Sequence, residues 1–162
     1  MQVCFECSGA DRRGRRPSKG DQQGACARIP APRTQHAATI DRYLDAYGDT
    51  DETSRRTKVA ETFSDEATFA DPPFEATGVD EITASFGAVL SQFPGHTFAR
   101  TSDVDVHHAA GRYTWQLTGT HGEIAVAGMD FVRFAEDGRL DSVVGFFGEV
   151  PPVDSGSPET RA

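Results

Sequence analysis

Apolar positions recur with helical spacing in the first half of the chain. A first helix is predicted from an N-cap at Thr39 to Gly48, because its apolar positions follow the i, i+3, i+4, i+7 pattern. These positions are Ile40, Tyr43, Leu44 and Tyr47. After a polar loop at 49–53, a second helix is predicted through Lys58, Val59 and Phe63. A third is predicted between Gly78 and Pro94, since its apolar residues share one face.

The second half alternates apolar and polar residues, which is typical of strands. Strands are predicted at about 98–107, 112–118, 123–134 and 140–147, with a hairpin turn at 136–139. Residues 64–73 are predicted to form a turn and a short extended segment that Pro72 and Pro73 stop. Helices followed by antiparallel strands indicate a single α+β domain, in which a curved antiparallel sheet wraps around the N-terminal helices and leaves a cone-shaped pocket.

Composition divides the 162 residues into three parts. Residues 1–33 are rich in Gly, Pro, Arg and Gln and predict a disordered basic arm. The domain is expected to span residues 34–150, followed by a disordered tail at 151–162. The arm carries seven Lys/Arg against three Asp/Glu, whereas residues 34–162 carry nine against 22, a net charge of −13. Such an acidic body disfavours nucleic acid and membrane as partners.

The cysteines and the absence of a signal pattern indicate a cytoplasmic protein with reduced thiols. Cys4, Cys7 and Cys26 all lie in the arm, so no disulfide framework is expected in the domain. The Cys4/Cys7 pair has the spacing of a metal or redox pair, but an isolated pair of this kind is more often without function.

Asp130 is the most informative position in the strand predicted at 123–134. Alternation places it on the same face as Ile124, Val126, Val132 and Phe134, which aims a carboxyl into the core. Burying an ionised carboxylate costs several kcal/mol, so the group must be paired, hydrogen-bonded or protonated. A carboxyl of this kind indicates an acid/base site, although pairing with a nearby Arg is the alternative.

The opposite face of the same strand is apolar as well. It carries Ala127, Met129 and Phe131, which indicates a second covering layer. A twofold homodimer is the simplest way to supply that layer.

Four segments resemble the nuclear transport factor 2-like superfamily, within it the SnoaL-like polyketide cyclase and ketosteroid isomerase branch. They are Asp41-Arg-Tyr-Leu, the run 63–72, Gly78-Val-Asp-Glu-Ile, and the run 129–140, and the resemblance covers about residues 37–150. By resemblance, Tyr43 falls at the oxyanion-hole tyrosine, Asp71 at the general base, and Asp130 at the protonated aspartic acid. Tyr43 as a core residue and Asp71 as a turn former before Pro72 are the competing interpretations.

The same resemblance and the strand pattern give a predicted pocket lining. Its members are Phe63, Phe86, Leu90, Tyr113, Trp115, Val132, Val143 and Phe147. Phe63 and Phe86 stand where some isomerases carry supporting tyrosines, so the donor network is expected to be thinner than in those enzymes.

Taken together, the resemblance implies cofactor-free proton transfer on a small, mostly apolar carbonyl compound, with the chain acting as an isomerase or cyclase if it is an enzyme. Asp71 would remove the proton, while Tyr43 and neutral Asp130 would donate hydrogen bonds to the enolate oxygen. A non-catalytic module that binds a small molecule or a partner is the alternative. A metal at Asp103, Asp105 and His107, and epoxide hydrolysis, rank below both.

Overall fold

The computed structural model describes residues 32–152, and the predictions for the basic arm, its cysteines and the end of the tail lie outside this range. This part of the chain contains three helices: α1 (Pro32–Tyr47), α2 (Glu52–Thr62) and α3 (Gly78–Gln92). The strands are β1 (Phe63–Asp71), β2 (Phe74–Thr77), β3 (Thr97–Arg100), β4 (Asp105–His107), β5 (Ala110–Thr118), β6 (Ile124–Phe134) and β7 (Leu140–Phe147).

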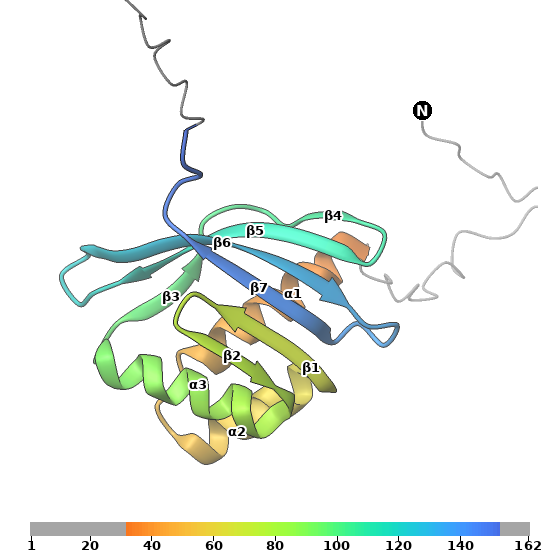
Figure 1. Cartoon of the computed structure of the whole chain (residues 1–162), viewed down its shortest axis with the longest axis horizontal. Coiled ribbons are helices and arrows are strands. Elements are labelled where there is room, and N and C mark those ends of the chain that lie inside the picture. Colours follow the sequence, from red (N-terminus) through yellow and green to blue (C-terminus); the bar gives the residue numbers. More distant parts are fainter. Residues whose placement is uncertain (1–31, 153–162) are drawn as a thin grey trace, which may run out of the picture.

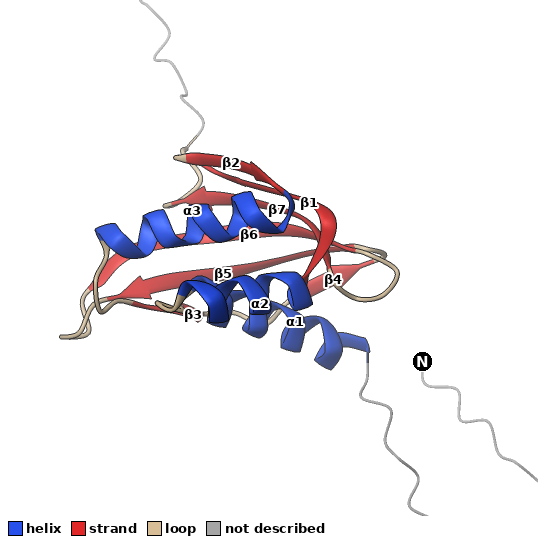
Figure 2. Ribbon diagram, turned by 90° about the horizontal axis from the view of Figure 1, so that it is seen from below, coloured by secondary structure: helices blue, strands red, loops and turns tan. Residues whose placement is uncertain are grey.

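The strands form one curved sheet that packs on the helices from one side (Figures 1 and 2). Its order is β2-β1-β7-β6-β5-β3, and β4 also pairs with β5. The predicted α+β fold, with a curved sheet around N-terminal helices, is confirmed. One detail differs, because β1 pairs with β7 in parallel and the sheet is therefore mixed rather than wholly antiparallel.

Helix boundaries shift from the predicted ones for local reasons. Helix α1 begins at Pro32, not after Thr39, which lies inside the helix and donates hydrogen bonds to the carbonyls of Gln35 and Gly138. A proline is well suited to the first helical position, since its missing N–H has no intrahelical partner there. The prediction of Thr39 as N-cap is therefore wrong.

Helix α2 has its N-cap at Asp51, whose carboxylate accepts a hydrogen bond from the Ser54 N–H. It ends before Phe63, which has extended backbone and opens β1. The assignment of Phe63 to the second helix is therefore wrong.

Two strand predictions also change. Pro72 and Pro73 form a turn after which the chain continues into β2, antiparallel to β1, so they do not end the extended region. The single strand predicted at 98–107 is divided into β3 and β4. Between them, the Ser102 hydroxyl accepts a hydrogen bond from the Thr114 N–H and takes the place of a ladder bond.

The core lies between the concave face of the sheet and the helices. Tyr43, Tyr47, Phe63, Phe69 and Phe86 form an aromatic cluster in which α1, β1 and α3 meet. Ile124, predicted to share the inward face of β6, is instead 59% exposed, because the β5–β6 register shifts near the start of β6. None of the helices in the described region is long and apolar enough to cross a membrane.

Candidate functional site: a buried carboxyl pair beside an apolar cavity

Asp130 lies in the middle of β6 with its side chain inside the molecule, 1% exposed. On the neighbouring strand β5, the Tyr113 hydroxyl donates to Oδ2 over 2.5 Å, and the Trp115 indole N–H donates to Oδ1 over 2.6 Å. The bond from Tyr113 falls in the range expected of an O–H donor to a charged acceptor, and the bond from Trp115 is shorter than usual for an N–H donor. Asp130 is thus surrounded by donors, and the arrangement favours a carboxylate that accepts hydrogen bonds.

Asp71 is the last residue of β1 and is 8% exposed. Its Oδ2 accepts a hydrogen bond from the Tyr47 hydroxyl at 3.3 Å, which is long for an O–H···O bond. No described residue donates a hydrogen bond to its Oδ1, although that atom is buried. Asp71 is therefore the less satisfied of the two carboxyls.

Gly145 on β7 allows the two carboxyls to approach each other. It pairs directly with Asp130 across the β6–β7 ladder. A Cβ at this position would overlap Oδ1 of Asp71 and would lie 3.2 Å from Oδ1 of Asp130. From their distances to that point, the two oxygens are no more than about 5 Å apart. The absence of a side chain at Gly145 makes the carboxyl pair sterically possible.

Burial raises the pKa of both acids, and the charge of Asp130 raises that of Asp71 further. Burial, followed by the negative charge of Asp130, raises the pKa of Asp71 from 3.8 to about 7. Burial raises the pKa of Asp130 to about 6, opposed by hydrogen bonds from Tyr113, Trp115 and Tyr43. Because two like charges at this distance repel, the pair holds about one proton near neutral pH. The hydrogen bonds from Tyr113 and Trp115 favour the negative charge on Asp130 and the shared proton on Asp71.

Three buried tyrosines surround the pair as neutral phenols. Burial, with the charges of the two acids, raises the pKa of Tyr43, Tyr47 and Tyr113 well above the ordinary value of 10.0. At neutral pH each can donate a hydrogen bond but does not ionise.

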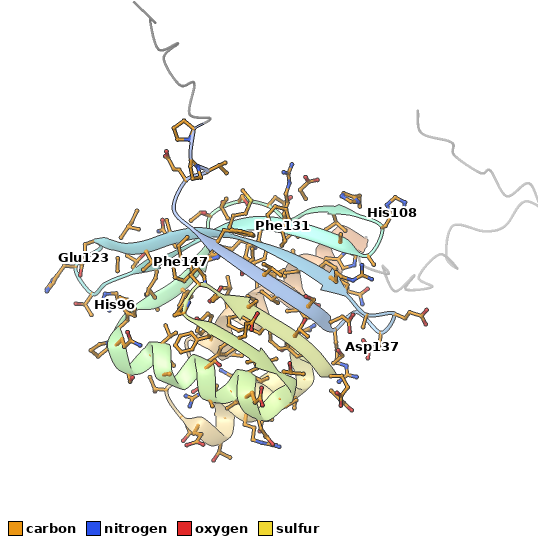
Figure 3. The ribbon with its side chains drawn as sticks, viewed as in Figure 1. His96, His108, Glu123, Phe131, Asp137 and Phe147 are labelled. Atoms are coloured by element: carbon orange, nitrogen blue, oxygen red, sulfur yellow. The ribbon has the colours of Figure 1, made fainter. Side chains whose placement is uncertain are left out.

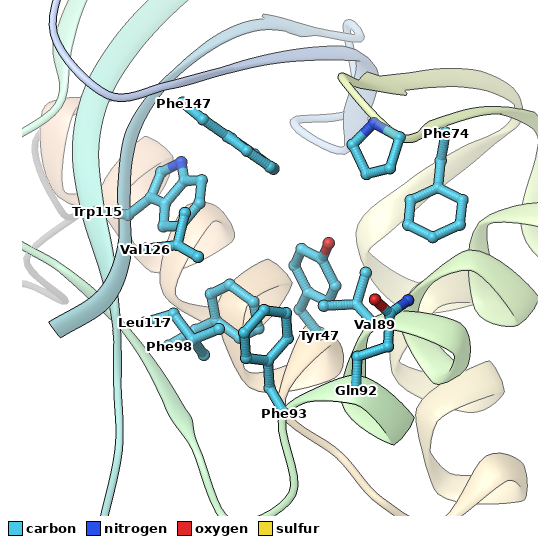
Figure 4. Close-up of a pocket in the computed structure, with 11 residues that line it drawn as sticks. Tyr47, Phe74, Val89, Gln92, Phe93, Phe98, Trp115, Leu117, Val126 and Phe147 are labelled. Atoms are coloured by element: carbon cyan, nitrogen blue, oxygen red, sulfur yellow. The ribbon is translucent and has the colours of Figure 1, made fainter. Parts of the chain in front are cut away.

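An apolar cavity of about 90 Å³ adjoins this cluster between the sheet and α3 (Figure 4). Its lining residues are Tyr47, Pro73, Phe74, Val89, Gln92, Phe93, Phe98, Trp115, Leu117, Val126 and Phe147. Figure 4 shows the Tyr47 hydroxyl pointing into the space between Trp115, Phe147 and Phe74. Asp71 lines a neighbouring open groove that shares Pro73 and Phe74 with the cavity.

The structure brings the three predicted catalytic residues into one cluster, since Asp71 and Asp130 form the pair and Tyr43 lies close enough to Asp130 to lower its pKa. Their catalytic roles stay predictions. Of the predicted pocket lining, Trp115 and Phe147 line the cavity. The remaining members do not line it; they are Phe63, Phe86, Leu90, Tyr113, Val132 and Val143. All of these except Leu90, which is half-buried, belong to the buried core.

Sequence reasoning missed two residues of the site. Tyr47 was assigned only to the apolar face of the first helix, yet its hydroxyl joins Asp71 to the cavity. Gly145 interrupts the apolar run Val143-Val-Gly-Phe-Phe147, and a glycine inside a strand often marks a close approach of other atoms. That interruption was the available signal.

Within residues 32–152, no group of three or more His, Cys, Asp or Glu side chains is placed to hold a metal ion. The row Asp103, Asp105 and His107 does not form such a group. Asp105 instead makes a salt bridge with Arg112, and Asp103 lies 3.7 Å from the Arg100 guanidinium.

Comparison with known proteins adds independent information. The model of the SnoaL-like domain family matches residues 40–143. A solved structure from Agrobacterium tumefaciens str. C58, provisionally assigned as an isomerase of the SnoaL-like family, is 31% identical with a TM-score of 0.68. The match covers 72% of this chain and 99% of that protein. No curated protein sequence matches the chain.

Two more distant structures share the fold. A protein of unknown function from Exiguobacterium sp. 255-15, described as NTF2-like, is 21% identical over 69% of this chain and 99% of its own, with a TM-score of 0.55. A SnoaL-like polyketide cyclase, provisionally assigned, from Jannaschia sp. CCS1 is 18% identical over 72% of this chain and 88% of its own, with a TM-score of 0.59.

Proposed function

Since this chain belongs to the SnoaL-like domain family, with the cone-shaped fold of nuclear transport factor 2-like proteins, we propose that it catalyses cofactor-free proton transfer on a small apolar carbonyl compound. The reaction would be an isomerisation or cyclisation of the ketosteroid isomerase type. The observation that carries the proposal is the buried Asp71–Asp130 pair, which lies beside an apolar cavity.

Asp71 is the proposed general base. With a pKa near 7, about half of the Asp71 carboxyls are ionised at neutral pH, and the ionised form is the one that takes up the substrate proton and later returns it. Its Oδ1 accepts no hydrogen bond from a described residue, so a lone pair remains available for a substrate C–H. The proton would leave the carbon α to the carbonyl, and its electron pair would form the enolate.

Tyr47 is the proposed hydrogen-bond donor to the carbonyl oxygen of the ligand. Its hydroxyl points into the cavity and is held by Asp71 through a bond of 3.3 Å only. A bond of that length is weak, so turning the hydroxyl towards a ligand oxygen costs little. As charge develops on that oxygen, a donor in an apolar cavity stabilises it more strongly than water-exposed donors would.

In our proposal, Asp130 supports Asp71 and Tyr47 and does not contact the ligand itself. Its oxygens already accept hydrogen bonds from Tyr113 and Trp115, and Asp130 lines neither the cavity nor the adjoining groove that Asp71 lines. Its negative charge instead helps to raise the pKa of Asp71. Tyr43, which lowers the pKa of Asp130, belongs to this supporting set. The roles proposed for Tyr43 and Asp130 thus differ from the direct donor roles that the resemblance implies.

The cavity limits the size of the ligand. Its volume of about 90 Å³ is smaller than the roughly 150 Å³ of an engineered protein cavity that binds benzene. We therefore expect a small cyclic or branched ketone, with the carbonyl at Tyr47 and the apolar body against Phe93, Phe98 and Leu117.

The proposal is tested by thermal-shift screening with small cyclic enones, followed by NMR measurement of deuterium uptake from D2O at the carbon next to the carbonyl. Asp71→Asn should retain ligand binding and lose catalysed exchange. Binding by the wild type without any catalysed exchange would overturn the enzymatic proposal and establish the alternative, a small-molecule binding module.

A further inference from the structure

The apolar cavity beside the carboxyl pair contains a second polar side chain, that of Gln92. Among the described residues that line the cavity, Tyr47, Gln92 and Trp115 carry a hydrogen-bonding group in the side chain. The Trp115 indole N–H is firmly bonded to Asp130. The Tyr47 hydroxyl and the Gln92 amide therefore remain as the two side-chain groups in the lining that can bind a ligand.

These two groups lie at different depths. Tyr47 is 3% exposed, whereas Gln92 is the last residue of α3 and is exposed. Val89, one helical turn before Gln92 and on the same side of α3, also lines the cavity. His96, just after α3, and Phe147, which lines the cavity, lie at the same end of the molecule (Figure 3). The cavity thus extends from a buried hydroxyl to an exposed amide at its mouth.

The amide oxygen of Gln92 is available as an acceptor. Its Nε2 donates to the Ala88 carbonyl over 3.4 Å, and the same carbonyl accepts a bond of 2.7 Å from the Ser91 hydroxyl. Among the described residues, none donates a hydrogen bond to Oε1 of Gln92. Figure 4 shows this side chain on the α3 side of the cavity, opposite Leu117. An amide whose NH2 group is turned towards its own helix presents its oxygen to a donor, such as a hydroxyl group.

We propose that Gln92 selects small ketones that carry a hydroxyl group at the end away from the carbonyl. The inference rests on the proposed function, which places the ligand carbonyl at Tyr47. With the carbonyl there, the apolar body fills the cavity, and a hydroxyl at the far end donates to Oε1 of Gln92 at the mouth. The ligand is then held by one polar contact at each end of the cavity.

The charges around the cavity favour a neutral hydroxyl over an acidic group at this end. None of the residues that line the cavity is charged. Gln92 ends α3, and the C-terminal end of a helix carries a partial negative charge. Residues 34–162 add a net charge of −13. A ligand carboxylate beside Gln92 would therefore be repelled and would find no cation in the lining.

The experiment measures dissociation constants for the full-length wild type by isothermal titration calorimetry with four cyclohex-2-enones. Carbon 4, across the ring from the carbonyl, carries hydrogen, hydroxyl, hydroxymethyl or carboxylate in the four compounds. The better of the two alcohols should bind about fivefold more tightly than the parent enone, which corresponds to the net contribution of one neutral hydrogen bond. The carboxylate should bind more weakly than the parent.

Substitutions at position 92 assign this preference to the amide oxygen. Gln92→Met keeps a side chain of similar length and removes the amide, so the preference for the alcohol should disappear. Gln92→Glu keeps an acceptor oxygen and should retain the preference. Gln35→Met is the matched control, because Gln35 is exposed on α1 and does not line the cavity. A merely structural effect at position 92 would weaken binding of the parent and the alcohol alike and leave their ratio unchanged.

The outcomes separate this inference from the proposed function. Equal affinity of the wild type for the parent and both alcohols would overturn the role of Gln92, as would an undiminished preference in Gln92→Met. Absence of binding for all four compounds would overturn it as well. A wild type that prefers the alcohol but catalyses no deuterium exchange contradicts the proposed function alone, whereas exchange without any preference for the alcohol contradicts this inference alone.

Discussion

Replacing Asp130 by Asn should lower the pKa of Asp71, and this change tests the electrostatic basis of the site. An asparagine fits the same hydrogen-bond partners. Its amide oxygen can accept from the Trp115 indole, and its NH2 group can donate to the Tyr113 hydroxyl oxygen, which is also an acceptor. The substitution therefore removes one negative charge and keeps the volume, while the Tyr113 hydroxyl changes from donor to acceptor.

The expected magnitude follows from the separation of the two carboxyls. Two unit charges about 5 Å apart interact by about 3 kcal/mol at an effective dielectric constant of about 20, which corresponds to about 2 pH units. Burial is the larger cause of the shift at Asp71, and it stays in the variant. We therefore expect the pKa of Asp71 to fall from about 7 by roughly 1 to 2 units.

Carbon-13 NMR titration of the aspartate carboxyl carbons measures this shift directly. The acid limb of the pH–rate profile for deuterium exchange should move by the same amount in Asp130→Asn. Asp141→Asn is the control, because it removes the same charge from an exposed position on β7 and should leave Asp71 unchanged. An Asp71 pKa that is equal in wild type and Asp130→Asn would refute the proposed role of Asp130.

Three further changes test the remaining parts of the site. Folding raises the pKa of Asp71, so its favourable contribution to stability is complete below about pH 4 and is lost as the pH rises through about 7, by up to about 4 kcal/mol. The unfolding free energy of Asp71→Asn, measured by urea denaturation, should therefore depend less on pH than that of the wild type. An equal pH dependence in the two proteins would contradict the shifted pKa. Gly145→Ala should displace the Asp71 side chain, lower the unfolding free energy by about 1–3 kcal/mol and abolish catalysed deuterium exchange. Full deuterium exchange in a folded variant would argue against the steric constraint at Gly145. Tyr47→Phe should reduce the exchange rate about 100-fold with little change in stability, and a larger loss in Tyr43→Phe than in Tyr47→Phe would return the donor role to Tyr43.

The burial of Asp130 was predictable, whereas its partners were not. Alternation along β6 fixes which face a residue occupies, and one charge among apolar neighbours is enough to reveal an inward carboxyl. The identity of the donors depends on the β5–β6 register, which sets Tyr113 opposite Asp130. Tyr113 and Trp115 were thus expected as pocket lining by their pattern, and the register makes them donors.

The difference between Tyr43 and Tyr47 has a similar origin. Both lie on the apolar face of α1, one helical turn apart, so periodicity cannot distinguish them. Tyr47 reaches Asp71 because of how far β1 extends along the helix. This is a tertiary contact, which the period of the helix does not reveal. The start of α1 could not be predicted because residues 32–38 contain no large aliphatic or aromatic hydrocarbon side chain and so show no apolar period.

Because β1 pairs with β7 in parallel, the sheet is completed late in folding. Thr68 and Ser142 touch although they are 74 positions apart, so the sheet closes only after almost the whole domain has been synthesised. Until β7 docks between β1 and β6, Asp71 and Asp130 are separate, hydrated acids, and neither burial nor a neighbouring charge raises their pKa. Contacts between such distant segments form slowly. The paired carboxyls should therefore be among the last features to appear during folding, and a chain shortened before residue 140 should never acquire them.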